Sequence, residues 1–547
     1  MDFQLLDADY TYIGNRPMVR LYGRDGSGKS VCCFASKFEP YFFVMPDNPE
    51  EVAARLKNRF REIDRIEHVE MFEPVGYSRT PSKMLKVVTS EPKGVAAIRE
   101  EVRHTPGVQG IYETDILFAN RFMIDHGLAG MGWVRAEEAG GADMQVECSL
   151  RFTAGRIDPV ATLANAPLRY LSFDIECLPL NGGMPVPEKS PIIMMSLAFE
   201  PSYGTLGTLV LVGKKADVSG EVEAFSSEKE MLKRFFEIIR DYDPDVITGY
   251  NINGFDFPYI IDRLSALKGD INDRIGRDGR AASYRKIGAF PQVGVTGRVV
   301  ADAMLLMKRD FSLKQYSLKF TAKEFLGMEK LDVAPLEMES YWNDGGERFR
   351  KLIEYARRDA VLALQFMRKL RLLDKYIALA RASGVLLQDV LDGGQSAMVE
   401  SILLREFRQQ NRVVPPRPDS GITDTRDEES EELKGGEVLE PKRGLLENVV
   451  VLDYKSLYPT IMMAHNLCYT TVVTGDEPAE AETAPSGGRF ATAKVKKGIV
   501  PAILERLLSE RVETRKRMKA AAGEEYRVLD ATQLALKILL NSFYGYS

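Results

Sequence analysis

The run Val449-Val450-Val451-Leu452 constrains the fold most, because four apolar residues in succession predict a strand that is buried on both faces. The run ends at Asp453, and Pro459 then forces a change of chain direction. Asp453 is therefore expected where a strand ends and a turn begins, a common position for ligand binding at a sheet. A helix cap or a turn residue would use the same aspartate, so this carboxylate alone leaves a catalytic role open.

Length and composition indicate a soluble protein of several domains. A chain of 547 residues is too long for one hydrophobic core. No apolar run approaches the roughly 18 to 20 residues that span a membrane, and the N-terminus lacks the basic start of a secretory signal, which predicts a cytoplasmic protein. The five cysteines and four histidines are scattered, which argues against a disulfide framework and a zinc site and leaves metal chemistry to carboxylates.

Charge is unevenly distributed along the chain. The net charge of −6 argues against a uniformly basic surface for nucleic acid. Two acidic segments, 424–432 and 476–482, are interpreted as solvated loops. Between Lys494 and Lys519 the sign reverses, with nine basic and three acidic residues.

The first 120 residues predict an α+β module, with strands at 17–22 and 31–35 and helices at 49–60 and 94–102. Within it, Gly23–Ser30 matches the phosphate-binding pattern G-x-x-x-x-G-K-[ST]. A true P-loop leads from a strand directly into a helix, whereas the residues after Ser30 are β-like. The segment is therefore interpreted as a hairpin turn, with a P-loop NTPase as the alternative.

From about Leu168 the pattern predicts an α/β domain. A strand at 171–176 would place Asp174 and Glu176 on one face and their apolar neighbours in the core. Two adjacent carboxylates on a parallel, buried strand repel each other unless a divalent cation neutralises them. A solvated strand face is the alternative.

Two further segments carry carboxylates that can point inward. A strand at 246–249 leads through Asn251 to Asp256, at the junction with a helix that Pro258 would start. Tyr355 and Asp359 are four residues apart in a helical pattern and share a face. Asp302 is a candidate structural support. Each of these could be a cap or a surface acid; together with Asp174 and Glu176 they predict a carboxylate metal centre.

These patterns resemble the motifs of family B DNA polymerases. Asp174-Ile175-Glu176, the segment 251–256 and Tyr355 with Asp359 are similar to the three exonuclease motifs of that family. The segments 453–459 and 537–545 are similar to its first and second polymerase motifs, and Asp9-Tyr10 and Phe118 lie in surroundings similar to those of the archaeal amino-terminal domain. The resemblance to an archaeal-type enzyme covers nearly the whole chain.

The resemblance implies a mixed α/β and α+β multidomain fold. It predicts an N-terminal α+β domain at 1–163 that returns at about 372–415, an RNase H-like 3′–5′ exonuclease domain at 164–371, a partial palm at 416–498, and two-helix fingers at 499–547.

For proofreading, the resemblance implies that four carboxylates hold two Mg²⁺ or Mn²⁺ ions, namely Asp174, Glu176, Asp256 and Asp359. Tyr355 would orient the attacking water. Phe255 and Phe257 are candidates for stacking on the frayed 3′ end of the DNA.

For synthesis, the resemblance implies that Asp453 binds the two metal ions that join the dNTP and the primer, and that the Tyr458 ring excludes a 2′-hydroxyl. Two helices would present one cationic face to the triphosphate, with Arg511 and Arg515 on the first and Lys537, Asn541 and Tyr544 on the second. The family usually has Lys where Arg515 stands. Solvated basic helix faces are the alternative.

A template-uracil pocket is a further implication of the archaeal resemblance. Tyr10, Pro92, Val95 and Phe118 occupy the matching positions. Ordinary core packing would use the same residue types.

Two departures from the family pattern concern synthesis. Leu433-Lys434-Gly435-Gly436 stands where the family has Y-x-G-G, so the tyrosine that helps primer switching is missing. The sequence ends at Ser547, before the third motif Y-x-D-T-D-S and the thumb. This predicts a second polypeptide of about 200 residues that carries the third motif and the thumb, as in a split polymerase. An interruption by an intein and a truncated gene product are the alternative explanations.

The expected partners are therefore primer–template DNA, dNTPs and this second polypeptide, with a sliding clamp as a further candidate and no membrane. The competing functions are a stand-alone 3′–5′ exonuclease, a non-catalytic polymerase-like scaffold and the P-loop NTPase.

Overall fold

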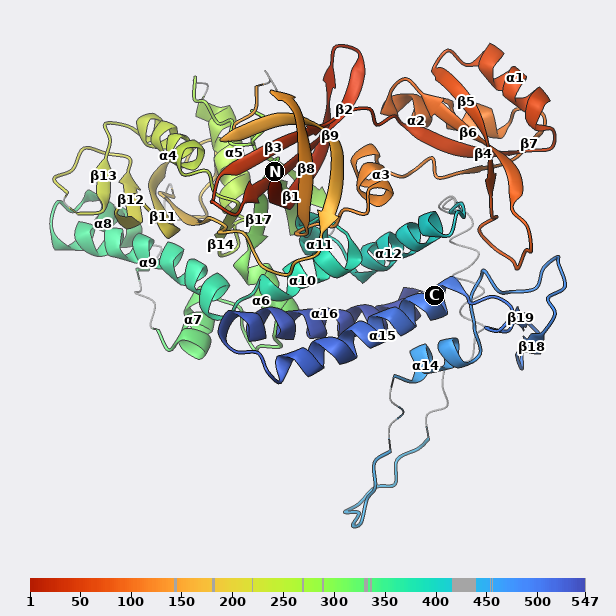
Figure 1. Ribbon diagram of the computed structural model, residues 1–547. Helices are drawn as coiled ribbons and strands as arrows, with labels where there is room; N and C mark the ends of the chain where they lie inside the picture. Colours follow the sequence, from red (N-terminus) through yellow and green to blue (C-terminus); the bar gives the residue numbers. More distant parts are fainter. Residues whose placement is uncertain are drawn as a thin grey trace.

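The computed structural model describes residues 1–141, 145–179, 183–218, 220–267, 270–287, 290–328, 333–334, 337–415, 439–452, 454 and 456–546. Figure 1 shows a β-barrel and a second small sheet at the N-terminus, an α/β unit beside them, and a layer of long helices beneath.

The N-terminal barrel is closed by five strands in the order β1-β2-β3-β9-β8. Their bounds are β1 Asp2–Ile13, β2 Arg16–Asp25, β3 Ser30–Ala35, β8 Trp133–Gly141 and β9 Leu150–Val160. Alternation along β3 sends Val31, Cys33 and Ala35 into the barrel core, where Phe122 also packs, while Cys32 joins a separate cluster on the outer face.

A four-stranded sheet, in the order β5-β6-β4-β7, forms the second N-terminal unit. The elements are β4 Tyr41–Pro46, α1 Pro49–Arg59, β5 Ile63–Met71, β6 Ser82–Thr89, α2 Pro92–Arg103, β7 Val108–Tyr112 and α3 Phe118–Asp125. Helix α1 begins at Pro49 behind the N-cap Asn48, whose side chain accepts a hydrogen bond from the backbone N–H of Glu51. The strands and helices predicted within the first 120 residues are confirmed.

The segment with the P-loop pattern is a hairpin turn between β2 and β3. Its amides bind the protein's own carboxylate, since Asp25 Oδ1 accepts hydrogen bonds from the backbone N–H of Ser27 at 2.9 Å and of Lys29 at 2.8 Å. A strand follows, not a helix. The predicted turn is confirmed, and the P-loop alternative is excluded.

The α/β unit is built on a six-stranded sheet in the order β13-β12-β11-β10-β14-β17. The strands are β10 Tyr170–Cys177, β11 Ile192–Tyr203, β12 Leu206–Val212, β13 Val222–Ala224, β14 Val246–Gly249 and β17 Val299–Asp302. Strand β10 is parallel to β14 but antiparallel to β11, so the prediction of a parallel strand holds on one side only. Its other neighbour is a hairpin partner, which sequence periodicity does not distinguish from a crossover.

Helices surround this sheet. They are α4 Glu228–Tyr242, α5 Asp256–Leu267, α6 Ala303–Asp310, α7 Leu318–Leu326, α8 Met338–Asn343 and α9 Glu347–Lys369, with a small hairpin of β15 Ser283–Ile287 and β16 Phe290–Gly294. The predicted helix around Tyr355 and Asp359 lies within α9 and is confirmed.

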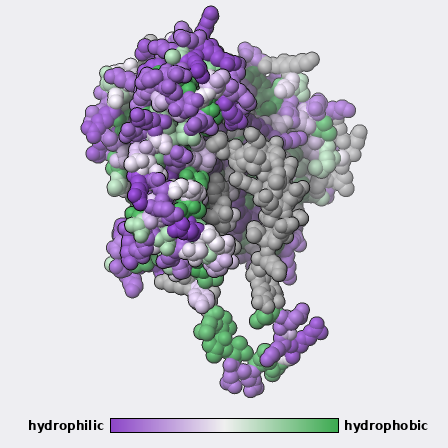
Figure 2. Space-filling model, turned by 90° about the vertical axis from the view of Figure 1, so that its right-hand side faces the viewer, coloured by the Kyte–Doolittle hydropathy of each residue, from purple (hydrophilic) through white to green (hydrophobic). Residues whose placement is uncertain are grey.

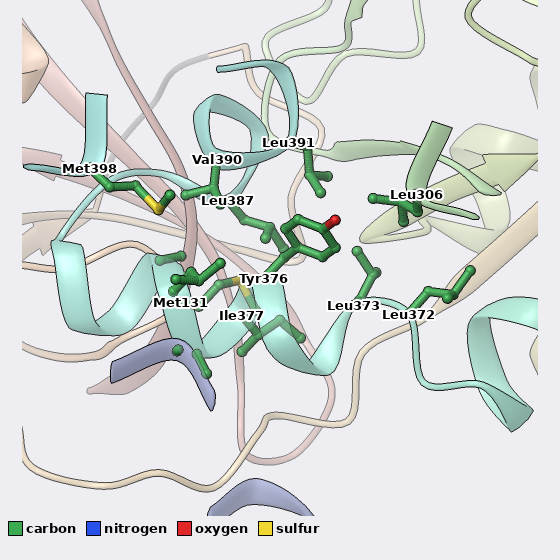
Figure 3. Close-up of a cluster of buried hydrophobic side chains, with 14 of the residues drawn as sticks. Met131, Leu306, Leu372, Leu373, Tyr376, Ile377, Leu387, Val390, Leu391 and Met398 are labelled. Atoms are coloured by element: carbon green, nitrogen blue, oxygen red, sulfur yellow. The ribbon is translucent and has the colours of Figure 1, made fainter. Parts of the chain in front are cut away.

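The remaining chain is mainly helical. It comprises α10 Asp374–Ser383, α11 Leu387–Asp392, α12 Gln395–Gln409, α14 Leu457–Ala464, β18 Ala481–Thr483, β19 Arg489–Ala491, α15 Ile499–Met518 and α16 Gly523–Tyr546. Figure 3 shows Tyr376 and Ile377 of α10 packed against Leu387 of α11 and Leu306 of α6. Leu504 of α15 and other residues of the long helices belong to the same core. The two long helices are therefore anchored to the rest of the molecule by apolar packing.

The expected buried strand at 449–452 is not formed. Val449, Val450, Val451 and Leu452 are 65% to 90% exposed, and they belong to none of the sheets that the structure describes. They lie in the segment that projects below the helices (Figure 1) and carries apolar residues at its surface (Figure 2). A strand needs a neighbouring edge for its backbone hydrogen bonds, and within the described ranges this chain provides none here. Asp453 and Lys455 lie outside the described residues.

Every helix within the described ranges is too short or too polar to cross a bilayer.

Candidate functional sites

Three carboxylates meet beside the central strand of the α/β unit. Asp174 and Glu176 project from one face of β10, and Asp359 comes from α9, which packs across β10 and β11. One ligand atom from each lies within 4.8 Å of the others. The alternate residues Phe173 and Ile175 are buried in the core, as predicted. Three anions this close repel one another, and an all-oxygen donor set suits Mg²⁺ or Mn²⁺, so these residues fit a divalent cation.

Asp256, the fourth predicted ligand, adjoins this group and is not part of it. It is the first residue of α5, is buried, and its Oδ1 accepts a hydrogen bond from the backbone N–H of Ile175 at 3.0 Å. Burial raises the pKa of Asp256 to about 7, with smaller contributions from the charges of Asp302 and Asp359. The structure therefore brings three predicted ligands together and directs the fourth carboxylate toward the backbone of β10.

Asp302 fixes the loop that leads to Asp256. Its carboxylate accepts hydrogen bonds from the backbone N–H groups of Asn251 at 3.0 Å and Asn253 at 3.1 Å, and it caps α6 through Met304 N–H at 2.9 Å. Its predicted role as a structural support is confirmed.

Replacing Asp302 with Ala is expected to lower the free energy of unfolding by about 2 to 4 kcal/mol, because the helix cap is lost and buried N–H groups are left without acceptors. Denaturant unfolding followed by tryptophan fluorescence measures this loss. Asp302→Asn keeps one acceptor oxygen and is expected to lose less than half as much; equal losses in both variants would contradict this role of the carboxylate.

The aromatic residues near Asp256 have different surroundings. Phe257 is buried, with its ring centroid 5.1 Å from that of Phe173, so its predicted stacking on DNA is wrong: the ring belongs to the core. Phe255 is half-buried, 5.3 Å from the Tyr259 ring, and stays a candidate. Tyr355 is half-buried on α9, one turn before Asp359.

Helices α15 and α16 lie side by side and carry the predicted cationic residues (Figure 1). Arg515, Lys537 and Asn541 are exposed and Arg511 is half-buried, whereas the side chain of Tyr544 lies outside the described part. Within the described residues, no carboxylate lies within 4.0 Å of the charged groups of Arg511, Arg515 or Lys537.

Other cations of α15 are paired: Arg506 lies 3.5 Å from Glu406 and Lys516 lies 3.6 Å from Glu513. Arg511 also has a buried Nε without a hydrogen-bond acceptor in the part of the chain that is described. The predicted face therefore carries positive charge that no carboxylate among the described residues neutralises.

The first polymerase motif is described only in part. Tyr458 lies in α14 and is 46% exposed. Asp453 and the segment 433–436 lie outside the described residues, so the structure assigns them no geometry.

Comparison with known proteins gives the family. Residues 109–320 match "DNA polymerase family B, exonuclease domain" and residues 385–547 match "DNA polymerase family B". The solved structure of the family B DNA polymerase from the hyperthermophilic archaeon Pyrobaculum calidifontis is similar, with a TM-score of 0.80 and 31% identity, over 100% of this chain and 68% of that one. The chain belongs to DNA polymerase family B.

Curated relatives of this family B chain come from both archaea and eukaryotes. The DNA polymerase delta catalytic subunit of Glycine max is 33% identical over 100% of this chain and 56% of its own length. The DNA polymerase of Pyrococcus glycovorans is 33% identical over 99% of this chain and 64% of its own length. The chain thus spans between half and two thirds of the length of these relatives. The predicted family and fold class are confirmed.

In this family B chain the four residues predicted for template uracil line one cavity of about 630 Å³. Tyr10 comes from β1, Pro92 and Val95 from α2, and Phe118 from α3, with the Tyr10 and Phe118 ring centroids 5.5 Å apart. Side chains from three separate elements thus surround one cavity, whereas ordinary core packing would leave no cavity between them.

Sequence reasoning missed other residues of this cavity. Tyr41 and Arg121 also line it, and the Arg121 guanidinium lies 4.7 Å from the Tyr41 ring centroid and pairs with buried Glu113. Nothing in the spacing of these residues signals a buried ion pair, because it joins the residue after β7 to α3 only after folding.

Proposed function

We propose that this chain is the greater part of a DNA-directed DNA polymerase with 3′–5′ proofreading exonuclease activity. The meeting of Asp174, Glu176 and Asp359 at β10 and α9 carries the exonuclease half of the proposal. The cations of α15 and α16 that have no carboxylate partner among the described residues support the polymerase half.

For proofreading, Asp174, Glu176 and Asp359 would hold Mg²⁺ or Mn²⁺, with Asp256 as the fourth carboxylate of a two-ion site. When bound, the ions supply an activated water and stabilise the leaving 3′ oxygen. The protein's own contribution is to hold these oxygens on a rigid strand and helix, while Tyr355 orients the water and Phe255 stacks on the unpaired 3′ base.

For synthesis, Asp453 would bind the catalytic Mg²⁺ or Mn²⁺ pair, and Tyr458 would exclude ribonucleotides by contact with the sugar. Arg511, Arg515 and Lys537 would bind the triphosphate, with Asn541 and Tyr544 on the same face of α16. The proposal includes two-helix fingers at 499–547 and a partial palm at 416–498. It also includes an N-terminal domain at 1–163 that returns at about 372–415, and an exonuclease domain at 164–371.

A second polypeptide that carries the third motif and the thumb is part of the same proposal. The exposed run Val449–Leu452 supports it, because β-branched residues that pair with no strand in the described part of the chain favour pairing with a strand from elsewhere. A sliding clamp and a cytoplasmic location stay predictions from the sequence.

Primer degradation and extension, assayed with and without that polypeptide, test the proposal. The chain alone is expected to shorten a mismatched primer in the presence of Mg²⁺, and template-directed extension is expected only with the second polypeptide. Degradation without extension in both conditions would identify a stand-alone exonuclease, and neither activity would identify a scaffold. Extension by the chain alone would remove the need for a partner.

The cavity between β1, α2 and α3 supports the archaeal-type assignment and a template-uracil site. Replacing Val95 with Phe would fill it, so the preference for uracil-containing over thymine-containing single-stranded DNA is expected to fall about tenfold, as measured by fluorescence anisotropy. Ala97→Phe, on the exposed face of the same helix, is the control. Equal affinity of the unmodified chain for both DNAs would argue against the site.

A further inference from the structure

Two cysteines lie in one cluster where the N-terminal barrel meets the α/β unit. Cys32 on β3 is fully buried on the outer face of the barrel, together with Tyr22 and Phe34. Val146 covers this cluster, and Cys148 is half-buried and packs against it. Cys32 is therefore shielded from solvent, whereas Cys148 is only half-buried.

The backbone on either side holds the two cysteines in place. Strands β3 and β9 are parallel, with Val31 opposite Leu150. Just before β9, the backbone N–H of Ser149 donates to Ser30 Oγ at 2.9 Å, so the segment containing Cys148 crosses the outer face of β3. At this crossing Cys148 packs against the cluster that contains Cys32.

Neighbouring groups make the two thiols chemically unequal. Interaction with the Cys32 thiol lowers the pKa of the Cys148 thiol, and the positive charge of buried Arg277 lowers it further. Burial raises the pKa of the Cys32 thiol. Since the thiolate is the nucleophile, Cys148 is the one that would react first.

We propose that Cys32 and Cys148 form a reversible disulfide when the protein meets a peroxide. The Cys148 thiolate attacks one peroxide oxygen, the O–O bond breaks, and Cys148 becomes a sulfenic acid as hydroxide leaves. Cys32 then attacks the Cys148 sulfur, the S–S bond forms, the S–O bond breaks, and water leaves. In total, two thiols lose two electrons and two protons, and hydrogen peroxide is reduced to two waters.

This disulfide would stabilise the contact between the N-terminal barrel and the α/β unit. Glu147, next to Cys148, donates its backbone N–H to the carbonyl oxygen of Arg277 at 2.7 Å. Arg277 pairs with Asp245 at 2.8 Å, and Asp245 also pairs with Arg24 of β2. A disulfide would add a covalent link to this network and close a long loop in the unfolded chain, which stabilises the folded state. The proposal is independent of the polymerase and exonuclease activities.

Peptide mapping of the 547-residue chain tests the bond directly. After treatment with hydrogen peroxide, alkylation of free thiols and digestion with trypsin, peptides 30–37 and 136–151 are expected to be linked, and dithiothreitol is expected to separate them. Peptide 30–37 also contains Cys33, which points into the barrel and serves as a matched control. The link is expected to persist in Cys33→Ala and to disappear in Cys32→Ala.

Thermal unfolding gives a second readout and shows whether each variant folds. The oxidised protein is expected to have a higher Tm than the reduced protein, and Cys148→Ala is expected to show no difference between the two treatments. Alkylation of both Cys32 and Cys148 after peroxide treatment, a link through Cys33, or oxidation of Cys148 to a sulfinic acid without any link would overturn the proposal.

Discussion

Replacing Asp359 or Asp174 with Ala is expected to reduce Mg²⁺-dependent 3′–5′ degradation of a single-stranded primer end by about a thousandfold or more. Each residue supplies one of the three carboxylates that lie within 4.8 Å of one another, and a bound metal ion contributes several kcal/mol to transition-state stabilisation. A time course with 5′-labelled DNA measures the rate.

The matched control is Glu354→Ala, which removes an exposed carboxylate from the same helix as Asp359 and is expected to leave the rate unchanged. Stability provides a further check. Without metal, Asp174→Ala is expected to unfold at the same or a higher denaturant concentration, because removing one of three crowded anions relieves repulsion. Undiminished degradation in both Asp174→Ala and Asp359→Ala would refute the proposed metal centre.

Replacing Lys537 with Ala is expected to raise the KM for dNTP by about 10- to 100-fold in an extension-competent form of the proposed polymerase. The reason is the loss of a charge-assisted contact to the triphosphate, worth roughly 1.5 to 3 kcal/mol. Arg511→Ala is expected to have an effect of similar size. Steady-state extension at varied dNTP concentration gives KM, and kcat is expected to change less.

Lys516→Ala is the control for this prediction, since Lys516 is an exposed cation of α15 that already lies 3.6 Å from Glu513. Its removal is expected to leave the KM for dNTP unchanged. If Lys537→Ala and Arg511→Ala behave like Lys516→Ala, the cationic face of α15 and α16 does not bind the triphosphate.

The order and spacing of the motifs led from sequence to the family, and local periodicity placed several site residues correctly. Alternation along β10 puts Asp174 and Glu176 on one face, and the helical repeat puts Tyr355 and Asp359 on another. These predictions succeeded because they depend only on backbone geometry within a few residues. The turn at Gly23–Ser30 was predictable for the same reason, since the β-like residues that follow rule out a helix start.

Tertiary structure decided what depends on neighbours distant in the chain. An apolar run predicts burial, but Val449–Leu452 is exposed, because burial of a strand requires a second strand that the run itself does not specify. The ring of Phe257 belongs to the core because Phe173 packs against it, and Asp256 at the start of α5 is directed to Ile175 of β10 by a hydrogen bond. The Cys32–Cys148 contact likewise depends on how two strands far apart in sequence pair. By itself the sequence determined the family and most local structure, and it named the carboxylates proposed to bind metal. Only the packing of separate elements determined which of those side chains meet, because local periodicity contains no information about contacts between distant segments.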